Sequence, residues 1–396
     1  MAEYVHFFPQ LAAATALVVA ALAAAPLFER VRLPSPAAFL AVGVGAGLLG
    51  VAPTKELSVV RLEQVGAVAL FVILFQGGLG TGFSAARAAA RPILALGVFG
   101  TVATATGLGV LARYGLGLDW SVSCLIAVAL APTDPAAVYA VLRGRPGSER
   151  ARTILEGESG FNDPAGIALM VAVMATVADV GSSYPHSAVR FIEELAIGSA
   201  AGVCGGLILI AALRVTHQID RSVQAVALVL GAVLLGALTA TLHGSGFLAV
   251  YVAGLLVSDA WARRAGTGQA VPEALSAVAE PMIFAMLGAA FAPFVGVDEI
   301  VDGILLMAVT VFVVRPLVTA VCLIGSGLPR RDRALVSWGG LKGAVPLLLA
   351  GYPALENFDG ARSVAATVLV ATAASLAVQG GTLPFIASRT VPHEQR

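Results

Sequence analysis

Charged residues are scarce in this chain. Only 12% of its 396 residues are Asp, Glu, Lys or Arg, and 58% are hydrophobic, whereas about a quarter of the residues in a soluble domain are charged. The 24 basic residues are balanced by 24 acidic ones, so no basic excess is available to bind nucleic acid. With a mean hydropathy of +0.90, the composition excludes a soluble enzyme, a disordered chain and a nucleic-acid-binding protein.

Residues that form disulfides, hold metals or catalyse hydrolysis are also few. The three cysteines, Cys124, Cys204 and Cys322, lie inside apolar runs without the spacing of a disulfide or metal site. The five histidines fall at predicted helix ends or at the termini, which leaves an intramembrane hydrolase without an obvious base. No Walker A sequence is present, so ATP is not expected as a partner. We therefore expect no enzymatic activity and no cofactor.

What the chain has instead is a series of apolar runs long enough to cross a bilayer, which takes about 20 residues. The first run lacks the preceding basic region of a signal peptide, so we expect it to be retained. The sequence predicts an all-α integral membrane protein with thirteen transmembrane helices. Their ranges are 11–28, 35–53, 62–84, 92–112, 120–142, 153–178, 191–213, 222–242, 244–260, 272–295, 302–325, 333–353 and 363–388.

The basic residues of the predicted loops fall mainly on one side of the membrane. If the N-terminus lies outside, 17 Lys and Arg residues lie inside and 5 lie outside. The positive-inside rule therefore predicts an N-out, C-in topology. No long hydrophilic stretch separates the spans, so residues 1–396 are predicted to form one membrane domain. Abundant alanine and only two lysines favour a bacterial protein of the inner (plasma) membrane.

Seven ionisable residues of the predicted spans are candidates for positions inside the bilayer. A charged group at the centre of a bilayer costs about 2.5–3.5 kcal/mol on insertion scales, so a group that is retained there is a functional candidate. These residues are Asp134, Glu156, Glu158, Asp163, Glu280, Arg315 and Lys342. Glu156 lies near the inner interface and Glu280 about a third of the way in, so the other five are the stronger candidates.

The segment Gly157–Pro164 carries the densest group of polar residues. On a helix Ser159 and Asp163 are i,i+4 neighbours on one face, and Glu158 and Asn162 are i,i+4 neighbours on the adjacent face. Oxygen-rich groups of this kind suit hard cations such as sodium. The alternative is a charged pair that only joins two helices, which would explain Glu158 better than Asp163.

Two predicted spans contain helix-breaking residues near mid-membrane. In the fifth span, Pro132 and Pro135 remove helical hydrogen bonds on either side of Asp134. The carbonyl of Thr133 is then free to face a cavity, and Asp134 can lie at the positive end of the second half-helix of its own span. A simple proline kink is the alternative. In the twelfth span, glycines and Pro346 surround Lys342 and predict a second broken helix.

The spacing of these breaks predicts an inverted repeat. Spans 1–6 and 8–13 each contain six helices, and span 5 of the first half corresponds to span 12 of the second. Because one span separates the halves, they enter the membrane from opposite sides. Broken helices at matching positions of inverted halves, crossing at mid-membrane, are typical of the ion site of a secondary transporter.

Several segments together resemble a known family. Thr133-Asp134-Pro135 and the Glu158–Asp163 segment are similar to the motifs of the monovalent cation:proton antiporter superfamily. The resemblance is to the branch with bacterial NhaP- and CvrA-type proteins and eukaryotic sodium–proton exchangers. Residues 71–78, 283–288 and 338–346 also resemble family segments, as does Val314-Arg315-Pro316. Gln76 stands where many relatives have an acid, and Lys342 where many have arginine.

The resemblance implies a homodimer of thirteen-helix subunits. It divides each subunit into a core bundle, roughly 92–178 and 302–388, and a dimerisation bundle, roughly 11–84 and 191–295. It also implies that Asp163 binds the cation or protons with help from Ser159 and the Thr133 carbonyl. Glu158 would pair with Arg315 as structural support.

The leading hypothesis is a secondary active monovalent cation:proton antiporter that serves pH homeostasis. One carboxylate, Asp163, would alternately bind a cation or a proton while the site faces each side in turn. Because Asn162 precedes Asp163 in place of a second acid, we expect one proton per cation and electroneutral exchange. The sequence leaves sodium, potassium and lithium open. An ion channel or an organic-solute carrier of similar architecture is the alternative.

Overall fold

The computed structural model describes residues 2–50, 59–134, 138, 148–178, 184–263 and 270–388. All regular secondary structure in these residues is helical, which confirms the predicted all-α class. Nine of the described helices are long and apolar enough to cross a membrane. Four shorter apolar helices accompany them: Ser35–Leu48, Trp120–Ala129, Gly246–Ala262 and Ala344–Leu355.

One group of helices comes from the first quarter and the middle of the chain. Within it α12 packs against α3, α10 and α11, and α13 packs against α2 and α3. Its members are α1 (Ala2–Arg30), α2 (Ser35–Leu48), α3 (Val59–Thr81), α10 (Tyr184–Val215), α11 (Arg221–Thr241), α12 (Gly246–Ala262) and α13 (Ala270–Phe291). A Cβ on Gly78 would lie 2.5 Å from the Tyr251 carbonyl oxygen, and one on Gly254 would lie 2.6 Å from that of Phe75. Glycine therefore lets the α3 and α12 backbones touch.

A second group surrounds the long helix α9 (Glu149–Ala178). Here α7 packs against α6, α9 and α17, and α18 packs against α14 and α17. The other members are α5 (Ala90–Leu94), α6 (Thr101–Gly115), α7 (Trp120–Ala129), α14 (Val297–Val309), α15 (Arg315–Cys322), α16 (Arg330–Trp338), α17 (Ala344–Leu355), α18 (Ala361–Ser375) and α19 (Gly381–Ser388). The short helix α4 (Phe83–Ala88) contacts both α12 and α9.

Three π-helical turns lie inside helices of the second group, at Ala95–Gly100, Thr310–Val314 and Leu376–Gly380. Each joins two α-helical segments, so the predicted spans 92–112, 302–325 and 363–388 are composite helices. The turn at Thr310–Val314 leads directly into Arg315. A π-helical turn accommodates one extra residue and so changes the direction in which the following side chains point. The sequence analysis did not predict these turns.

The two predicted breaks differ in how much of them is described. Helix α7 ends at Ala129, and residues 131–134 have no regular helix. The second half of the predicted span 120–142 lies outside the described residues apart from Val138. The break in the predicted span 333–353 is observed directly, because α16 ends at Trp338 and α17 begins only at Ala344.

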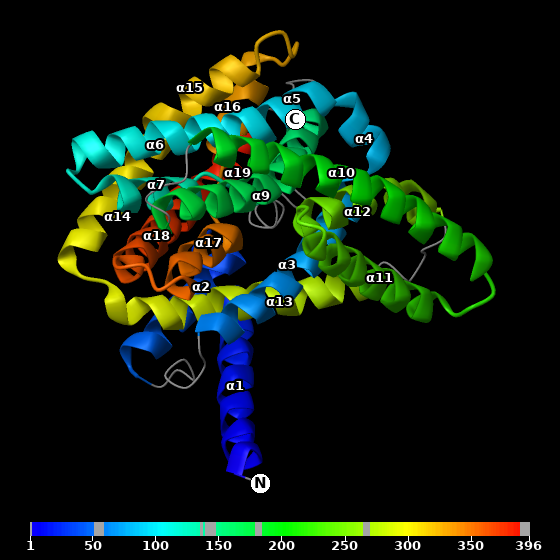
Figure 1. Ribbon diagram of the computed structural model, residues 1–396, viewed down its shortest axis with the longest axis horizontal. Helices are drawn as coiled ribbons and strands as arrows, with labels where there is room; N and C mark the ends of the chain where they lie inside the picture. The colour runs from blue at the N-terminus through cyan, green and yellow to red at the C-terminus, as the bar shows by residue number, and fades with distance from the viewer. Residues whose placement is uncertain are drawn as a thin grey trace.

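The groups meet where α9 contacts α3, α10 and α12, and where α17 contacts α3 and α13. Helix α1 lies apart from this boundary: Figure 1 shows it projecting away from the body with the N-terminus at its far end. Only 11% of its most apolar window, within Phe8–Arg30, is buried. The polar residues described next are buried in the interior around α9.

Candidate functional site

Four polar positions within six residues of α9 are buried. Glu158, Ser159, Asn162 and Asp163 are each about 1% exposed, in a helix that is otherwise mostly apolar. Burying polar or charged side chains without partners costs several kcal/mol. Their partners therefore identify how the site is built.

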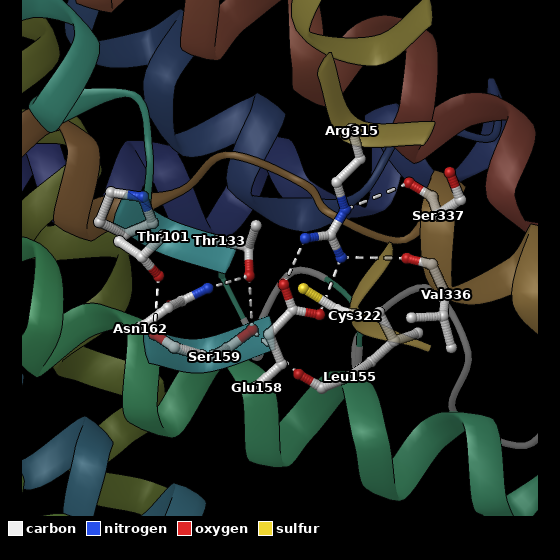
Figure 2. Close-up of polar contacts among 12 residues, drawn as sticks. Thr101, Thr133, Leu155, Glu158, Ser159, Asn162, Arg315, Cys322, Val336 and Ser337 are labelled. Carbon is white, nitrogen blue, oxygen red and sulfur yellow. Dashed lines mark hydrogen bonds and ion pairs between the residues drawn. The ribbon is translucent and has the colours of Figure 1, made fainter. Parts of the chain in front are cut away.

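The side chains of Ser159 and Asn162 form a hydrogen-bonded chain with Thr133, which follows α7 (Figure 2). The Asn162 amide donates to the Thr133 hydroxyl at 2.7 Å, and the Thr133 and Ser159 hydroxyl oxygens are 2.9 Å apart. Ser159 in turn donates to the Leu155 carbonyl at 3.0 Å. With that proton so used, Thr133 is the donor to Ser159. The structure therefore brings Thr133 and Ser159 together through the Thr133 side chain, whereas the sequence analysis considered only its carbonyl.

Asp163 lies one helical turn beyond Ser159, on the same face of α9. Its Oδ1 atom and the Oδ1 atom of Asn162 are buried and have no hydrogen-bond partner among the described residues. Asp134 and Lys342 act on Asp163 electrostatically. Beside the hydroxyl chain, the site therefore presents a carboxylate oxygen and an amide oxygen. Each of them can accept a hydrogen bond or coordinate a cation.

Glu158 faces away from this oxygen cluster and pairs with Arg315. The two make a bidentate ion pair, with Arg315 Nη2 2.8 Å from Glu158 Oε2 and a second bond from Nη1 to Oε1. Arg315 also donates to the carbonyls of Val336 at 3.0 Å and Ser337 at 3.4 Å, at the C-terminal end of α16. Figure 2 shows the guanidinium held between these groups. Both charges are thus satisfied inside the protein, which isolates Glu158 from Asn162.

The two broken segments are joined by reciprocal contacts of opposite charge. The Asp134 carboxylate accepts a hydrogen bond from the Ala344 backbone N–H at 3.2 Å, at the N-terminus of α17. Lys342 Nζ donates to the carbonyls of Ala131 at 3.2 Å and Pro132 at 3.0 Å, just after the C-terminal end of α7. A backbone bond of 2.8 Å from Asp134 to Leu341 links the same segments. Each charge thereby stabilises the helix end of opposite polarity.

One contact of Asp134 was not predicted from the sequence. Asp134 was expected at the start of the second half-helix of its own span, and the described contact is with the start of α17, about 210 residues further along the chain. The residues that would form its own half-helix lie outside the described part of the chain. The backbone N–H of Lys342 donates to the Ser375 hydroxyl, which in turn donates to the side-chain carbonyl of Gln379. Neither of these polar residues was predicted to support the site.

Glycine allows the two segments to approach. A Cβ on Gly343 would overlap the Asp134 carboxylate, and one on Gly340 would lie 2.7 Å from Arg315 Nε. The glycines around Lys342 therefore do more than interrupt the helix, because they leave the space that the Asp134 and Arg315 side chains occupy.

Gly343→Ala is accordingly expected to lower stability by about 1–3 kcal/mol, the usual cost of overpacking a buried site. The added methyl must push Asp134 away from the α17 N-terminus. Thermal unfolding in detergent measures this. Gly45→Ala is the control, since nothing lies within 4 Å of its Cβ position in α2 and alanine favours a helix. Equal melting temperatures for the two variants would contradict this account of Gly343.

The remaining sequence candidates, Glu280 and Gln76, lie on helices of the first group. Glu280 on α13 has a buried Oε1 without a hydrogen-bond partner among the described residues, and Asp134 acts on it electrostatically. Gln76 on α3 lines a cavity of about 100 Å³, away from the Thr133–Ser159–Asn162 contacts, together with Ser258, Trp261 and Glu273. The sequence analysis missed Tyr251 of α12, a fully buried residue whose ring packs on Phe161 beside Asn162.

Comparison with known proteins agrees with this geometry. A family model described as "Sodium/hydrogen exchanger, transmembrane" matches residues 17–389. The chain is 31% identical to the K(+)/H(+) antiporter NhaP2 of Shewanella oneidensis over 90% of its length. It is 26% identical to the Na(+)/H(+) antiporter NhaS2 of Synechocystis over 87% of its length. The chain spans only 63% and 65% of the lengths of these relatives.

A solved structure shares the fold. The sodium proton antiporter MjNhaP1 from Methanocaldococcus jannaschii aligns with a TM-score of 0.81 at 22% identity, covering 96% of this chain and 98% of that one. This likeness supports the helical architecture around the broken segments. Because the family model covers nearly the whole chain, this multi-pass membrane protein belongs to the transmembrane sodium/hydrogen exchanger family.

Proposed function

We propose that this protein is a secondary active monovalent cation:proton antiporter, in which Asp163 alternately binds a cation or a proton. The observation that carries the proposal is the buried Asp163 Oδ1, which has no hydrogen-bond partner among the described residues. It lies one turn from the hydroxyls of Ser159 and Thr133. The printed functions of the Shewanella and Synechocystis relatives, potassium–proton and sodium–proton antiport, support it.

The chemistry of exchange follows from the burial of this carboxylate. An ionised Asp163 in a low-dielectric interior needs a compensating positive charge. A proton supplies it by forming the neutral acid, and a monovalent cation supplies it by coordination to the carboxylate and the neighbouring oxygens. Binding one therefore displaces the other. Asn162 orients Thr133 and offers its own Oδ1 without adding a second charge.

Movement of one helix group against the other would expose Asp163 to each side in turn. In this proposal the core bundle, roughly 92–178 and 302–388, moves against the scaffold bundle, roughly 11–84 and 191–295. The packing supports this division, because the extensive contacts run within each group and α9 and α17 line the boundary. Contacts between Asp134, Lys342 and the two broken segments keep the ion site within the moving bundle.

The proposal includes the thirteen-span, N-out and C-in topology with inverted halves, in a bacterial plasma membrane. The nine long helices and four shorter apolar helices among the described residues fall in the predicted ranges and support it. A homodimer is proposed on the side of α1, whose apolar surface is largely uncovered within one subunit. A second copy packing on α1 would bury it.

Proton-coupled cation flux in proteoliposomes tests the function. Purified protein is reconstituted with a pH-sensitive dye, and chloride salts of sodium, potassium and lithium are added in turn. An antiporter changes the luminal pH on addition of at least one salt and not in empty vesicles. Cation flux without proton movement would indicate a channel instead, and no response to any alkali cation would favour an organic-solute carrier.

The stoichiometry gives a separate prediction. If Glu158 stays paired with Arg315 and only Asp163 exchanges its proton, one proton leaves for each cation that binds. The exchange rate at fixed ion gradients should then be the same with the membrane potential clamped at zero or inside-negative. A two-proton mechanism would gain ~2.3 kcal/mol per charge per 100 mV. A several-fold change in rate with potential would contradict the single-carboxylate mechanism.

A further inference from the structure

The buried phenol of Tyr251 makes no hydrogen bond of regular geometry. Tyr251 is 1% exposed and is the largest fully buried side chain of the described residues, and the polar side chain that acts on its hydroxyl at hydrogen-bonding range is Thr81 of α3. Buried tyrosine hydroxyls usually have a partner. A hydroxyl oxygen without a regular hydrogen bond in such a place is therefore a candidate ligand for a species that binds there.

The tyrosine comes from α12 in the scaffold group, but its ring packs on α9 beside the ion site. It meets Phe161 edge-on, with ring centroids 5.5 Å apart and an interplanar angle of 80°. A Cβ on Gly160 would overlap the phenol ring, so the absence of a side chain at Gly160 makes room for it. Gly160 precedes Asp163 by three residues, which is about 4.5 Å along a helix.

Glu156 lies on the same face of α9, four residues before Gly160 and seven before Asp163. It is half-buried near the end of α9 at which Glu149 begins the helix, about 10 Å along the axis from Asp163. Among the charged groups, Glu156 and Asp163 act electrostatically on the Tyr251 hydroxyl. The Tyr251 ring packs on Gly160, which lies between Glu156 and Asp163 along this face of α9.

We propose that Glu156 and Tyr251 form a transient monovalent-cation site on the route between Asp163 and the face of the membrane on which α9 begins. Glu156 attracts the cation and the Tyr251 hydroxyl replaces part of its water shell before it reaches Asp163. Carboxylate and hydroxyl oxygens are ligands of hard cations, and the negative charge of Glu156 repels anions. The ring also closes the route here, so α12 must shift relative to α9 for the cation to pass. This inference rests on the proposed antiport function.

The position on one side of Asp163 gives a sharp test. Tyr251→Phe keeps the ring on Gly160 and Phe161 and removes only the hydroxyl. Exchange is measured in vesicles of known orientation, with the cation added on the face where α9 begins and then on the opposite face. We expect the cation KM to rise about five- to tenfold on the first face, the effect of one lost polar contact. It should change less than about twofold on the other face, with a similar maximal rate.

Glu156→Gln should produce the same one-sided rise in KM, and the double variant should add little to either single one, because both groups hold the same ion. Glu149→Gln, on the same helix about two turns nearer the surface and 88% exposed, is the control for surface charge. Because Glu149 acts on Glu156 only through its charge, this substitution should change either KM less than about twofold. A symmetric rise in KM, or none, in a folded Tyr251→Phe protein that exchanges would overturn the site.

Failure of the two proposals can be told apart. Wild-type protein without proton-coupled flux would refute the antiport function itself. Wild-type exchange that the Tyr251→Phe and Glu156→Gln variants reproduce on both faces would refute the transient site alone. If Tyr251→Phe does not fold, the half-buried Glu156→Gln decides the result by the same comparison of the two faces.

Discussion

Asp163→Asn is expected to reduce proton-coupled exchange to the level of empty vesicles while leaving the fold intact. Asparagine keeps the shape of the side chain and can make the same number of polar contacts. It can neither release a proton nor supply the negative charge that a cation needs. Because Asp163 Oδ1 has no hydrogen-bond partner among the described residues, the substitution disrupts no visible contact at that atom. The dye assay in proteoliposomes measures the loss.

Two controls separate loss of chemistry from loss of structure. The melting temperature and the gel-filtration profile in detergent should match those of the wild type. Asp302→Asn makes the same chemical change in another span, on α14, where the side chain is only partly buried, and it should leave exchange unchanged. Substantial flux in a well-folded Asp163→Asn protein would refute the assignment of Asp163 as the exchanging group.

The sequence predicted those parts of the site that depend on local rules. The i,i+4 spacing placed Ser159 and Asp163 on one face of a helix, and the structure has them in the regular helix α9. Glycine and proline around Lys342 predicted the break between α16 and α17, because neither residue type supports a continuous helix. Apolar runs of about 20 residues located the membrane helices, because that length is needed to cross a bilayer.

Partners distant in the chain could not be predicted by the same rules. Spacing alone made Glu158 and Asn162 neighbours, but Glu158 bonds to Arg315, 157 residues away, while Asn162 bonds to Thr133. Local geometry likewise assigned Asp134 to its own half-helix and could not reveal its contact with α17. Both depend on how two halves of the chain cross, which no local pattern specifies.

Tyr251 shows a third kind of limit. Nothing in the apolar run of α12 distinguishes this tyrosine from one that packs in the core or faces lipid. Its importance follows from the missing side chain at Gly160, a residue 91 positions earlier, and from the lack of a regular hydrogen bond at its hydroxyl among the described residues. A small residue on one helix and a large one on another become informative only when the packing is known.

Glu158→Ala should destabilise the protein more than Asp163→Ala does. Removing Glu158 leaves Arg315 in a buried place where, among the described residues, the carbonyls of Val336 and Ser337 are its remaining hydrogen-bond partners. Breaking a buried ion pair from one side typically costs about 3–5 kcal/mol, since the remaining charge is uncompensated. Removing Asp163 deletes a group whose Oδ1 already lacks a protein partner among the described residues. Thermal unfolding in detergent should therefore give a clearly lower melting temperature for Glu158→Ala.

A double variant distinguishes the lost pair from a simple cavity. Replacing Glu158 with Gln and Arg315 with Met together removes both charges and keeps most of the volume. If the unpaired guanidinium is the main cost, this double variant should be more stable than Glu158→Ala, because two compensating charges are removed at once. If the cavity is the main cost, Glu158→Gln alone should restore most of the stability. Equal melting temperatures for Glu158→Ala and Asp163→Ala would contradict the structural role of the pair, and Glu158 would then have to be considered as a second exchanging carboxylate.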